Sequence, residues 1–357
     1  MRCVVPRCVR RLRPEKEKAT PRKGALPSAL AIAIALWTCL AARAEPVTLK
    51  LSFFTSDRSI IYQCQIEPFA DAVNTEGAGL VQVKVYFSGA ISPVQSEQPQ
   101  LVRDGVADIA NVAPGYTPRL FPDTSVLELP GLFRDQLEGS LVFTRLAEAG
   151  ALDGYKDFFV VGAFVTAGEI IHSRKPIVSL AGLKDQKIRV NNEIEAATLR
   201  KLGAVPLLLP LNRTMAALSK GEIDGVTIPP SMVFEFGYGR LTSHHYLLQL
   251  GGAPVTLLMN RKKLLSLPPR AQEIIRKYSG TWLAEQTSAC TEAKDREMTA
   301  RLKGDPRRKV VEPSPADRAA AQMAFSEVAK NWEAESPRHR ELLGLVKAEI
   351  ARLRHNK

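Results

Sequence analysis

The sequence predicts an α/β fold, and three observations support that class. Short apolar segments with strand-like alternation follow one another along the chain, separated by segments whose apolar residues recur at helical spacing. This alternation is typical of βαβ units. The chain has 357 residues, enough for about two domains. Its content of 45% hydrophobic and 24% charged residues is that of a globular protein, and it excludes disorder, collagen and coiled coil for most of the chain.

The first 44 residues are predicted to be a cleaved export signal. A basic region is followed by an apolar run over 26–40, which is shorter than the roughly 20 residues that cross a membrane comfortably. Ala42-Arg43-Ala44 then provides a small-x-small cleavage pattern, which leaves Glu45 as the new N-terminus. An uncleaved anchor, or lipidation at Cys39, remains an alternative. We expect export, most simply to a bacterial periplasm.

The formal charge of +12 is concentrated in this leader, which contains ten basic and two acidic residues. The rest of the chain carries 39 basic and 35 acidic residues, a net charge of +4. A chain so close to neutral is not expected to bind nucleic acid as its main activity.

Eight strands and eight helices are expected after the leader. The strands are short runs rich in β-branched and apolar residues, at 47–54, 80–87, 106–112, 158–164, 187–190, 205–209, 223–227 and 255–259. The helices have apolar residues at helical spacing, and several of them end at a glycine, at 59–73, 99–104, 134–149, 193–202, 212–219, 268–302, 315–332 and 338–354. We expect the strands to form parallel sheets.

No catalytic or metal-binding motif is present. The nucleophile elbow, the dinucleotide and phosphate loops, the zinc-protease helix and the C-x-x-C pair are all missing from the sequence. His172, His244 and His245 are interpreted as surface or capping residues. No metal or cofactor is expected, and an enzyme is unlikely on these grounds. Cys64 and Cys290 could pair in an oxidising compartment, although two separate buried thiols is the simpler interpretation.

One segment points to anion binding. Arg189 lies in the short strand predicted at 187–190, and Asn192 is placed to cap the next helix, with Glu195 three residues later. A guanidinium therefore lies beside a helix N-terminus at the carboxyl end of a strand. Both groups favour a carboxylate, and ligands of α/β sheets bind at this edge. A solvated arginine is the alternative.

Four stretches of the chain carry a family resemblance. They are Ser88-Gly89 to Pro93 with LVRDGVADIA, VLELPGLF, GLKDQKIRV, and LGAVPLLLPLNRTMAALSKGEIDGV. Together they resemble the DctP-type substrate-binding proteins of tripartite ATP-independent periplasmic (TRAP) transporters. The resemblance implies a two-lobed periplasmic binding protein fold, with a ligand cleft between the lobes and a long connecting helix. It also implies that the small and large membrane subunits of such a transporter are partners.

The resemblance assigns residues as well. Arg189 falls on the family's carboxylate-binding arginine, and Asn192 on a position that often lines the pocket. With the family fold, we expect a first lobe of 45–166 plus 255–294 and a second lobe of 167–254 plus 295–357.

Two departures from the family pattern bear on the ligand. Ile228 stands where the family often has an asparagine, and Glu169 replaces a second arginine. A second ligand carboxylate would meet Glu169 as a like charge. We therefore expect a monocarboxylate with a largely apolar body and a hydroxyl or amine donor, such as an aromatic or hydroxy acid. Leu211 is also expected to contact the ligand, and the aromatic walls are Phe54, Tyr116, Phe234 and Phe236.

The predicted function is capture of an organic monocarboxylate, with Arg189 as its anchor. Two alternatives remain open: a receptor that feeds a sensor protein rather than a permease, and a periplasmic enzyme on the same scaffold.

Overall fold

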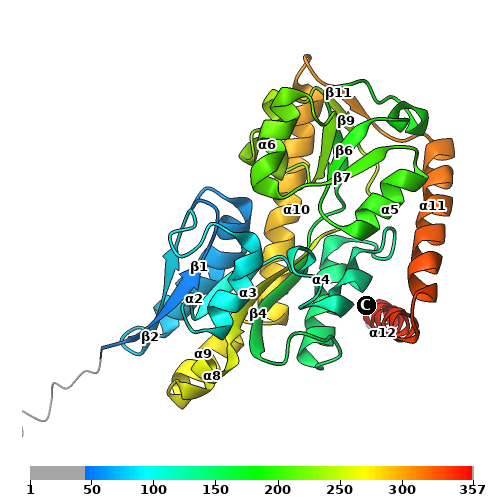
Figure 1. The fold of residues 1–357 in the computed structure, drawn as a ribbon. Helices are drawn as coiled ribbons and strands as arrows, with labels where there is room; N and C mark the ends of the chain where they lie inside the picture. The colour runs from blue at the N-terminus through cyan, green and yellow to red at the C-terminus, as the bar shows by residue number, and fades with distance from the viewer. Residues whose placement is uncertain (1–44, 356–357) are drawn as a thin grey trace, which may run out of the picture. The chain divides into compact units, whose positions relative to one another are not determined.

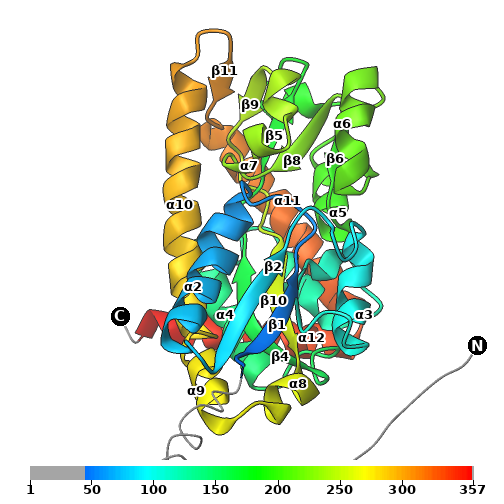
Figure 2. The same ribbon diagram turned by 90° about the vertical axis from the view of Figure 1, so that its left-hand side faces the viewer.

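The computed structural model describes residues 45–355, and the predicted export signal lies outside this range. The described chain is a mixed α/β structure with two sheets, one in each of two lobes (Figures 1 and 2). The fold class expected from the sequence is confirmed.

The first sheet has five strands in the order β2-β1-β3-β10-β4. In this order the strands span Val81–Tyr86, Val47–Ser52, Ile109–Val112, Pro254–Asn260 and Phe158–Val165. β1 runs parallel to β2 and β3, whereas β10 runs antiparallel to both β3 and β4.

The second sheet has six strands in the order β11-β9-β5-β8-β6-β7. In this order they span Lys309–Val311, His244–Tyr246, Ile170–Ser173, Gly225–Ile228, Lys187–Val190 and Val205–Leu208. β5 is antiparallel to β8 and β9, and the other pairs are parallel. The expectation of purely parallel sheets was therefore wrong. The chain crosses from one sheet to the other through β4 and β5 and returns through β9 and β10, and β5 and β10 are the strands that run antiparallel.

Helices cover both sheets. The α-helices α2 to α12 span Glu67–Glu76, Gln98–Arg103, Gln136–Glu148, Glu193–Lys201, Leu211–Lys220, Met232–Glu235, Arg261–Ser266, Pro269–Lys277, Thr281–Gly304, Pro315–Ala334 and Pro337–His355. Shorter helical turns, η1 to η6, span Tyr62–Ile66, Gln95–Glu97, Pro114–Tyr116, Pro122–Glu128, Leu180–Leu183 and Tyr238–Arg240.

The long helix expected over 268–302 is two helices. Gly280 separates α9 from α10 with φ +61°, a left-handed value that interrupts a right-handed helix. The 24-residue helix α10 runs alongside both lobes (Figures 1 and 2). Strands β5, β9 and β11, of three or four residues each, were not predicted from the sequence.

Cys64 of η1 and Cys290 of α10 form a disulfide across 226 residues of sequence. The interpretation as two separate thiols was wrong. The bond ties the long helix to the first lobe.

Helix α12 packs against α4, and Leu342, Leu343 and Val346 share a core with Leu141 and Phe143. The lobe boundaries expected from the sequence stay a prediction, and this contact favours assigning 337–355 to the first lobe rather than the second. Across residues 45–355, no helix combines the length and hydropathy needed to cross a membrane.

Candidate functional site

A cavity of about 110 Å³ lies where the two lobes meet. The ends of β1 and β3 and the turn η3 supply one side, and residues after β6, β8 and α7 supply the other. Seven residues singled out from the sequence line it together: Phe54, Tyr116, Glu169, Asn192, Leu211, Ile228 and Phe236. The remaining wall is largely apolar and includes Phe53, Ile61, Met232 and Val255.

Arg189 is fully buried behind this cavity rather than in its wall. Its Nε donates to the carbonyl oxygen of Leu209 at 2.9 Å, and Nη2 donates to the hydroxyl of Tyr116 at 3.2 Å. Nη1 is buried with no hydrogen-bond partner among the described residues. A buried cationic donor without an acceptor is costly, so this nitrogen marks a place where an anion would be stabilised.

Asn192 caps α5, as the sequence predicted. Its side-chain oxygen accepts from the backbone N–H of Glu195 at 2.7 Å. The side chain of Glu195 reaches back to the backbone N–H of Asn191 at 2.8 Å, one residue earlier than in a standard capping box. Asn192 thus serves as a helix cap and as part of the cavity wall.

Glu169 is buried, with an exposed fraction of 4%. The amide nitrogen of Asn191 donates to both of its carboxyl oxygens at 2.7 Å. Burial, and then the nearby Glu195, hold the pKa of Glu169 well above its ordinary value. The sequence analysis treated Glu169 as a charged group that repels a second carboxylate. The structure favours the protonated form instead, because no cation pairs directly with this carboxyl among the described side chains.

Glu128, at the end of η4, is a wall residue that the sequence analysis missed. Its carboxyl approaches Gly115 so closely that a Cβ there would lie 3.2 Å from Oε1. Burial, together with Glu195, raises the pKa of Glu128 to about 8. The available signal was a single acidic residue inside the apolar run VLELPGLF.

The expected aromatic walls are only partly present. Phe54, Tyr116 and Phe236 line the cavity, but Phe234 does not. The guanidinium groups of Arg301 and Arg308 stack on the ring of Phe234 instead, at 4.5 and 4.9 Å from its centroid. The expectation that Phe234 lines the pocket was therefore wrong.

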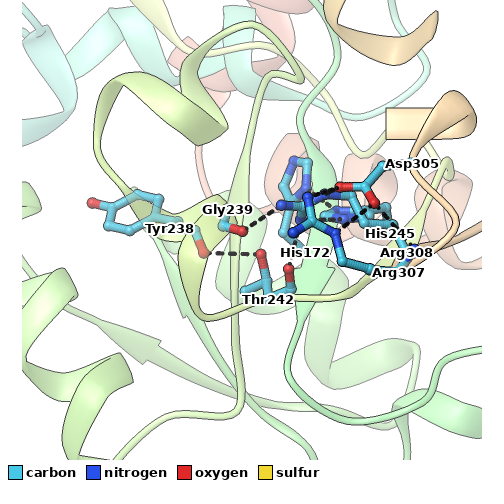
Figure 3. Close-up of polar contacts among 8 residues, drawn as sticks. All are labelled: His172, Tyr238, Gly239, Thr242, His245, Asp305, Arg307 and Arg308. Atoms are coloured by element: carbon cyan, nitrogen blue, oxygen red, sulfur yellow. Dashed lines mark hydrogen bonds and ion pairs between the residues drawn. The ribbon is translucent and has the colours of Figure 1, made fainter. Parts of the chain in front are cut away.

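Two of the three histidines interpreted as surface or capping residues, His172 and His245, lie in the interior instead, whereas His244 is half-buried. His172 and His245 are both fully buried, and their Nδ1 atoms lie 2.7 Å apart (Figure 3). His172 Nε2 lies 3.2 Å from the carbonyl oxygen of Ile228, and Arg308 Nη1 lies 3.4 Å from His245 Nε2.

One set of tautomers satisfies all of these contacts. Arg308 donates to His245 Nε2, His245 Nδ1–H donates to His172, and His172 Nε2–H donates to the Ile228 carbonyl. Both rings are then neutral, in agreement with burial lowering the pKa of His172 and bringing that of His245 to about 4. Within residues 45–355, no group of three or more His, Cys, Asp or Glu side chains is arranged to hold a metal ion.

Solved structures share this fold over nearly their whole length. One is a TRAP solute binding protein specific for aromatic acid ligands, from an unidentified marine microbe, in complex with metahydroxyphenylacetate. It is 26% identical, with a TM-score of 0.80 over 86% of this chain and 99% of that one. Another, a TRAP solute binding protein of Rhodoferax ferrireducens with copurified benzoate, is 27% identical, with a TM-score of 0.78 over 86% and 98% of the two chains.

Sequence relatives agree with the structures. The C4-dicarboxylate-binding periplasmic protein DctP of Rhodobacter capsulatus is 24% identical over 255 residues, which are 69% of this chain and 74% of the relative. The profile of the family described as "Bacterial extracellular solute-binding protein, family 7" (DctP) matches residues 51–335. Since this match spans most of the chain, the protein belongs to the DctP family of TRAP-transporter solute-binding proteins, which are not enzymes.

Proposed function

We propose that this protein captures a small monocarboxylate with an aromatic or similarly apolar body, in the periplasm, and delivers it to the membrane subunits of a TRAP transporter. The observation that carries the proposal is the fully buried Arg189, whose Nη1 lacks an acceptor next to a largely apolar cavity. A ligand carboxylate would supply that acceptor, and a charge-assisted bond of this kind is about twice as strong as a neutral one.

The size and lining of the cavity support a ligand with one ring. A dry apolar cavity of about 150 Å³ in another protein accommodates benzene, and this one measures about 110 Å³. Phe53, Phe54 and Phe236 offer aromatic faces to such a ring. The two solved relatives that are 26% and 27% identical bind metahydroxyphenylacetate and benzoate.

Tyr116 connects the arginine to the cavity. Its oxygen accepts from Arg189, so its own proton is available to donate to a ligand. In this arrangement the ligand carboxylate would take one hydrogen bond from Arg189 and one from Tyr116. Asn192, Glu169, Leu211 and Ile228 would contact the remainder of the ligand.

Family membership and the relatives named as periplasmic support the location and the membrane partners. Cell fractionation tests the first. The membrane partners are tested by the gene neighbourhood: the genes for the two membrane subunits should lie beside the gene for this protein. Their absence would favour a receptor that serves a sensor protein.

A thermal-shift screen of the purified protein tests the ligand class. It should contain benzoate, 3-hydroxybenzoate, 3-hydroxyphenylacetate and mandelate beside succinate, malate and glucuronate. A ligand present at 100 times its Kd stabilises the fold by about 2.7 kcal/mol. We expect shifts from ring-containing monocarboxylates. A shift from the dicarboxylates alone, or from none of these acids, would contradict the proposal.

A further inference from the structure

Three glutamate carboxyls gather in one buried place at the cavity. Glu169 precedes β5, Glu195 lies in the first turn of α5, and Glu128 ends η4; their exposed fractions are 4%, 8% and 8%. Glu128 and Glu169 line the cavity, and Glu195 interacts with both. Buried carboxylates are normally paired with cations. Three buried carboxyls without an ion pair of their own among the described residues therefore need another explanation.

The hydrogen bonds among the three glutamates are complete only if one of their carboxyls is protonated. Asn191 provides its side-chain amide to both oxygens of Glu169 and its backbone N–H to Oε2 of Glu195. Oε1 of Glu195 is buried and receives no donor from the described part of the chain. The carboxyl of Glu169 is within hydrogen-bonding reach of Glu195. If Glu169 carries a proton, it donates that proton to Glu195, and the unpartnered oxygen is satisfied.

The local charge balance points the same way. The titratable or charged groups that interact with the three glutamates are Arg189 from β6, Tyr116 from η3 and Tyr155, which lies near Glu128. Arg189 is the one cation in that set. Three ionised glutamates and a ligand carboxylate would place four negative charges around one positive charge at low dielectric, which costs far more than binding protons.

We propose, building on the proposed function, that Glu128, Glu169 and Glu195 form a proton-holding acid cluster and that the protein takes up a proton when an organic acid anion binds. Glu169 holds its proton already in the free protein and donates it to the otherwise unpartnered oxygen of Glu195. Glu128 is the group that completes its protonation on binding, because its buried carboxyl lines the cavity that the anion enters and its pKa of about 8 lies near the working range.

The direction of the pH dependence follows from linkage. An anion in the cavity raises the pKa of Glu128 further, so the complex holds more protons than the free protein. Affinity for the acid is therefore highest below pH 8 and falls as the pH rises above it, by up to about tenfold per pH unit. A cavity without this coupling would bind a benzoate-type anion equally well at pH 7 and pH 9.

Isothermal titration with benzoate and 3-hydroxybenzoate measures the coupling. Each acid is titrated at pH 8 in two buffers of different ionisation enthalpy, HEPES and Tris, and the difference in heat gives the number of protons bound. We expect measurable proton uptake at pH 8, close to the pKa of Glu128, and clearly less uptake at pH 6.

Glutamine variants locate the protons. Glu128→Gln should remove most of the uptake and flatten the affinity between pH 7 and pH 9, while affinity at pH 6 stays within a few-fold of the wild type. The matched control is Glu292→Gln on α10, since burial raises the pKa of Glu292 too but that residue lies outside the cavity wall.

The outcomes separate this inference from the proposed function. Tight binding with equal heats in the two buffers, or full proton uptake in Glu128→Gln, would overturn the acid cluster and leave the solute-binding role intact. Failure of both acids to bind at pH 6 as well as at pH 8 would contradict both proposals. The heats of the wild-type protein in the two buffers test proton uptake even if a variant does not fold.

Discussion

Two buried polar clusters in the second lobe differ in one respect, the completeness of their hydrogen bonding. In the histidine cluster, Arg308 donates to the carbonyl oxygens of Thr242 and Gly239 and to Asp305, and the two histidines complete the chain of bonds (Figure 3). In the cluster at the cavity, Arg189 Nη1 and Glu195 Oε1 remain without partners among the described residues.

Both clusters contain an arginine that is largely removed from solvent, fully for Arg189 and to 12% side-chain exposure for Arg308, so burial of charge alone does not identify a binding site. A fully bonded network holds its own elements together, here β5, β9 and the loop before β11. An incompletely bonded network costs stability unless a ligand completes it. The comparison supports the proposed ligand-binding role of Arg189 and favours a structural role for Arg308, and the following predictions test this distinction.

The largest effect is expected for Arg189→Ala. Truncating one partner of a buried charged pair costs about 2–5 kcal/mol, which corresponds to roughly 30-fold to several thousand-fold in Kd. Titration with 3-hydroxybenzoate measures the loss. Arg189→Lys keeps the charge but not the planar fork, so it should fall between the wild type and the alanine variant.

The second-largest effect is expected for Arg308→Ala, in stability rather than affinity. The side chain of Arg308 is 12% exposed, and its removal leaves the carbonyl oxygens of Thr242 and Gly239 without this donor, whereas Asp305 keeps Arg307 as a partner. Breaking a buried network of this kind costs about 3 kcal/mol, measurable by urea denaturation. Affinity for the acid should stay within a few-fold of the wild type; a loss as large as that of Arg189→Ala would erase the distinction between the clusters.

The histidine pair should make the fold sensitive to acid. Burial lowers the pKa of His245 to about 4, below its unfolded value near 6.5. The unfolded chain therefore binds more protons in this window, so stability is fully present above pH 6.5 and is lost as the pH falls toward 4. We expect a loss of about 3 kcal/mol. His245→Gln should flatten this part of the stability curve; an unchanged curve would contradict neutral, buried rings.

The smallest effect is expected for Tyr116→Phe. This change removes one hydrogen bond to Arg189 and the donor that we assign to the ligand. Such a bond contributes about 1 kcal/mol, so the Kd for 3-hydroxybenzoate should rise about fivefold. Leu211→Ile is a suitable control for a small change in the cavity wall. An increase in affinity for Tyr116→Phe would show that the phenol competes with the ligand for the guanidinium.

The parts of the site that the sequence predicted depend on local patterns. Strand β6 has the predicted bounds, and Asn192 caps α5 because cap, strand and helix all lie within a few residues of one another. Arg189 followed from its place in the strand together with the family resemblance.

The parts that were missed depend on contacts between distant segments. Cys64 and Cys290 meet across 226 residues, and His172 and His245 across 73. No spacing rule connects such pairs. Glu169 was identified as a site residue, but its protonation state depends on Glu195 and on burial, which only the folded chain reveals.

The most direct test of the account is a crystal structure of the protein with the tightest-binding acid from the screen. The account predicts that a carboxylate oxygen lies about 2.8 Å from Nη1 of Arg189, with the ring of the ligand against Phe53, Phe54 and Phe236. A ligand whose carboxylate points away from Arg189, while Nη1 remains without an acceptor, would contradict it.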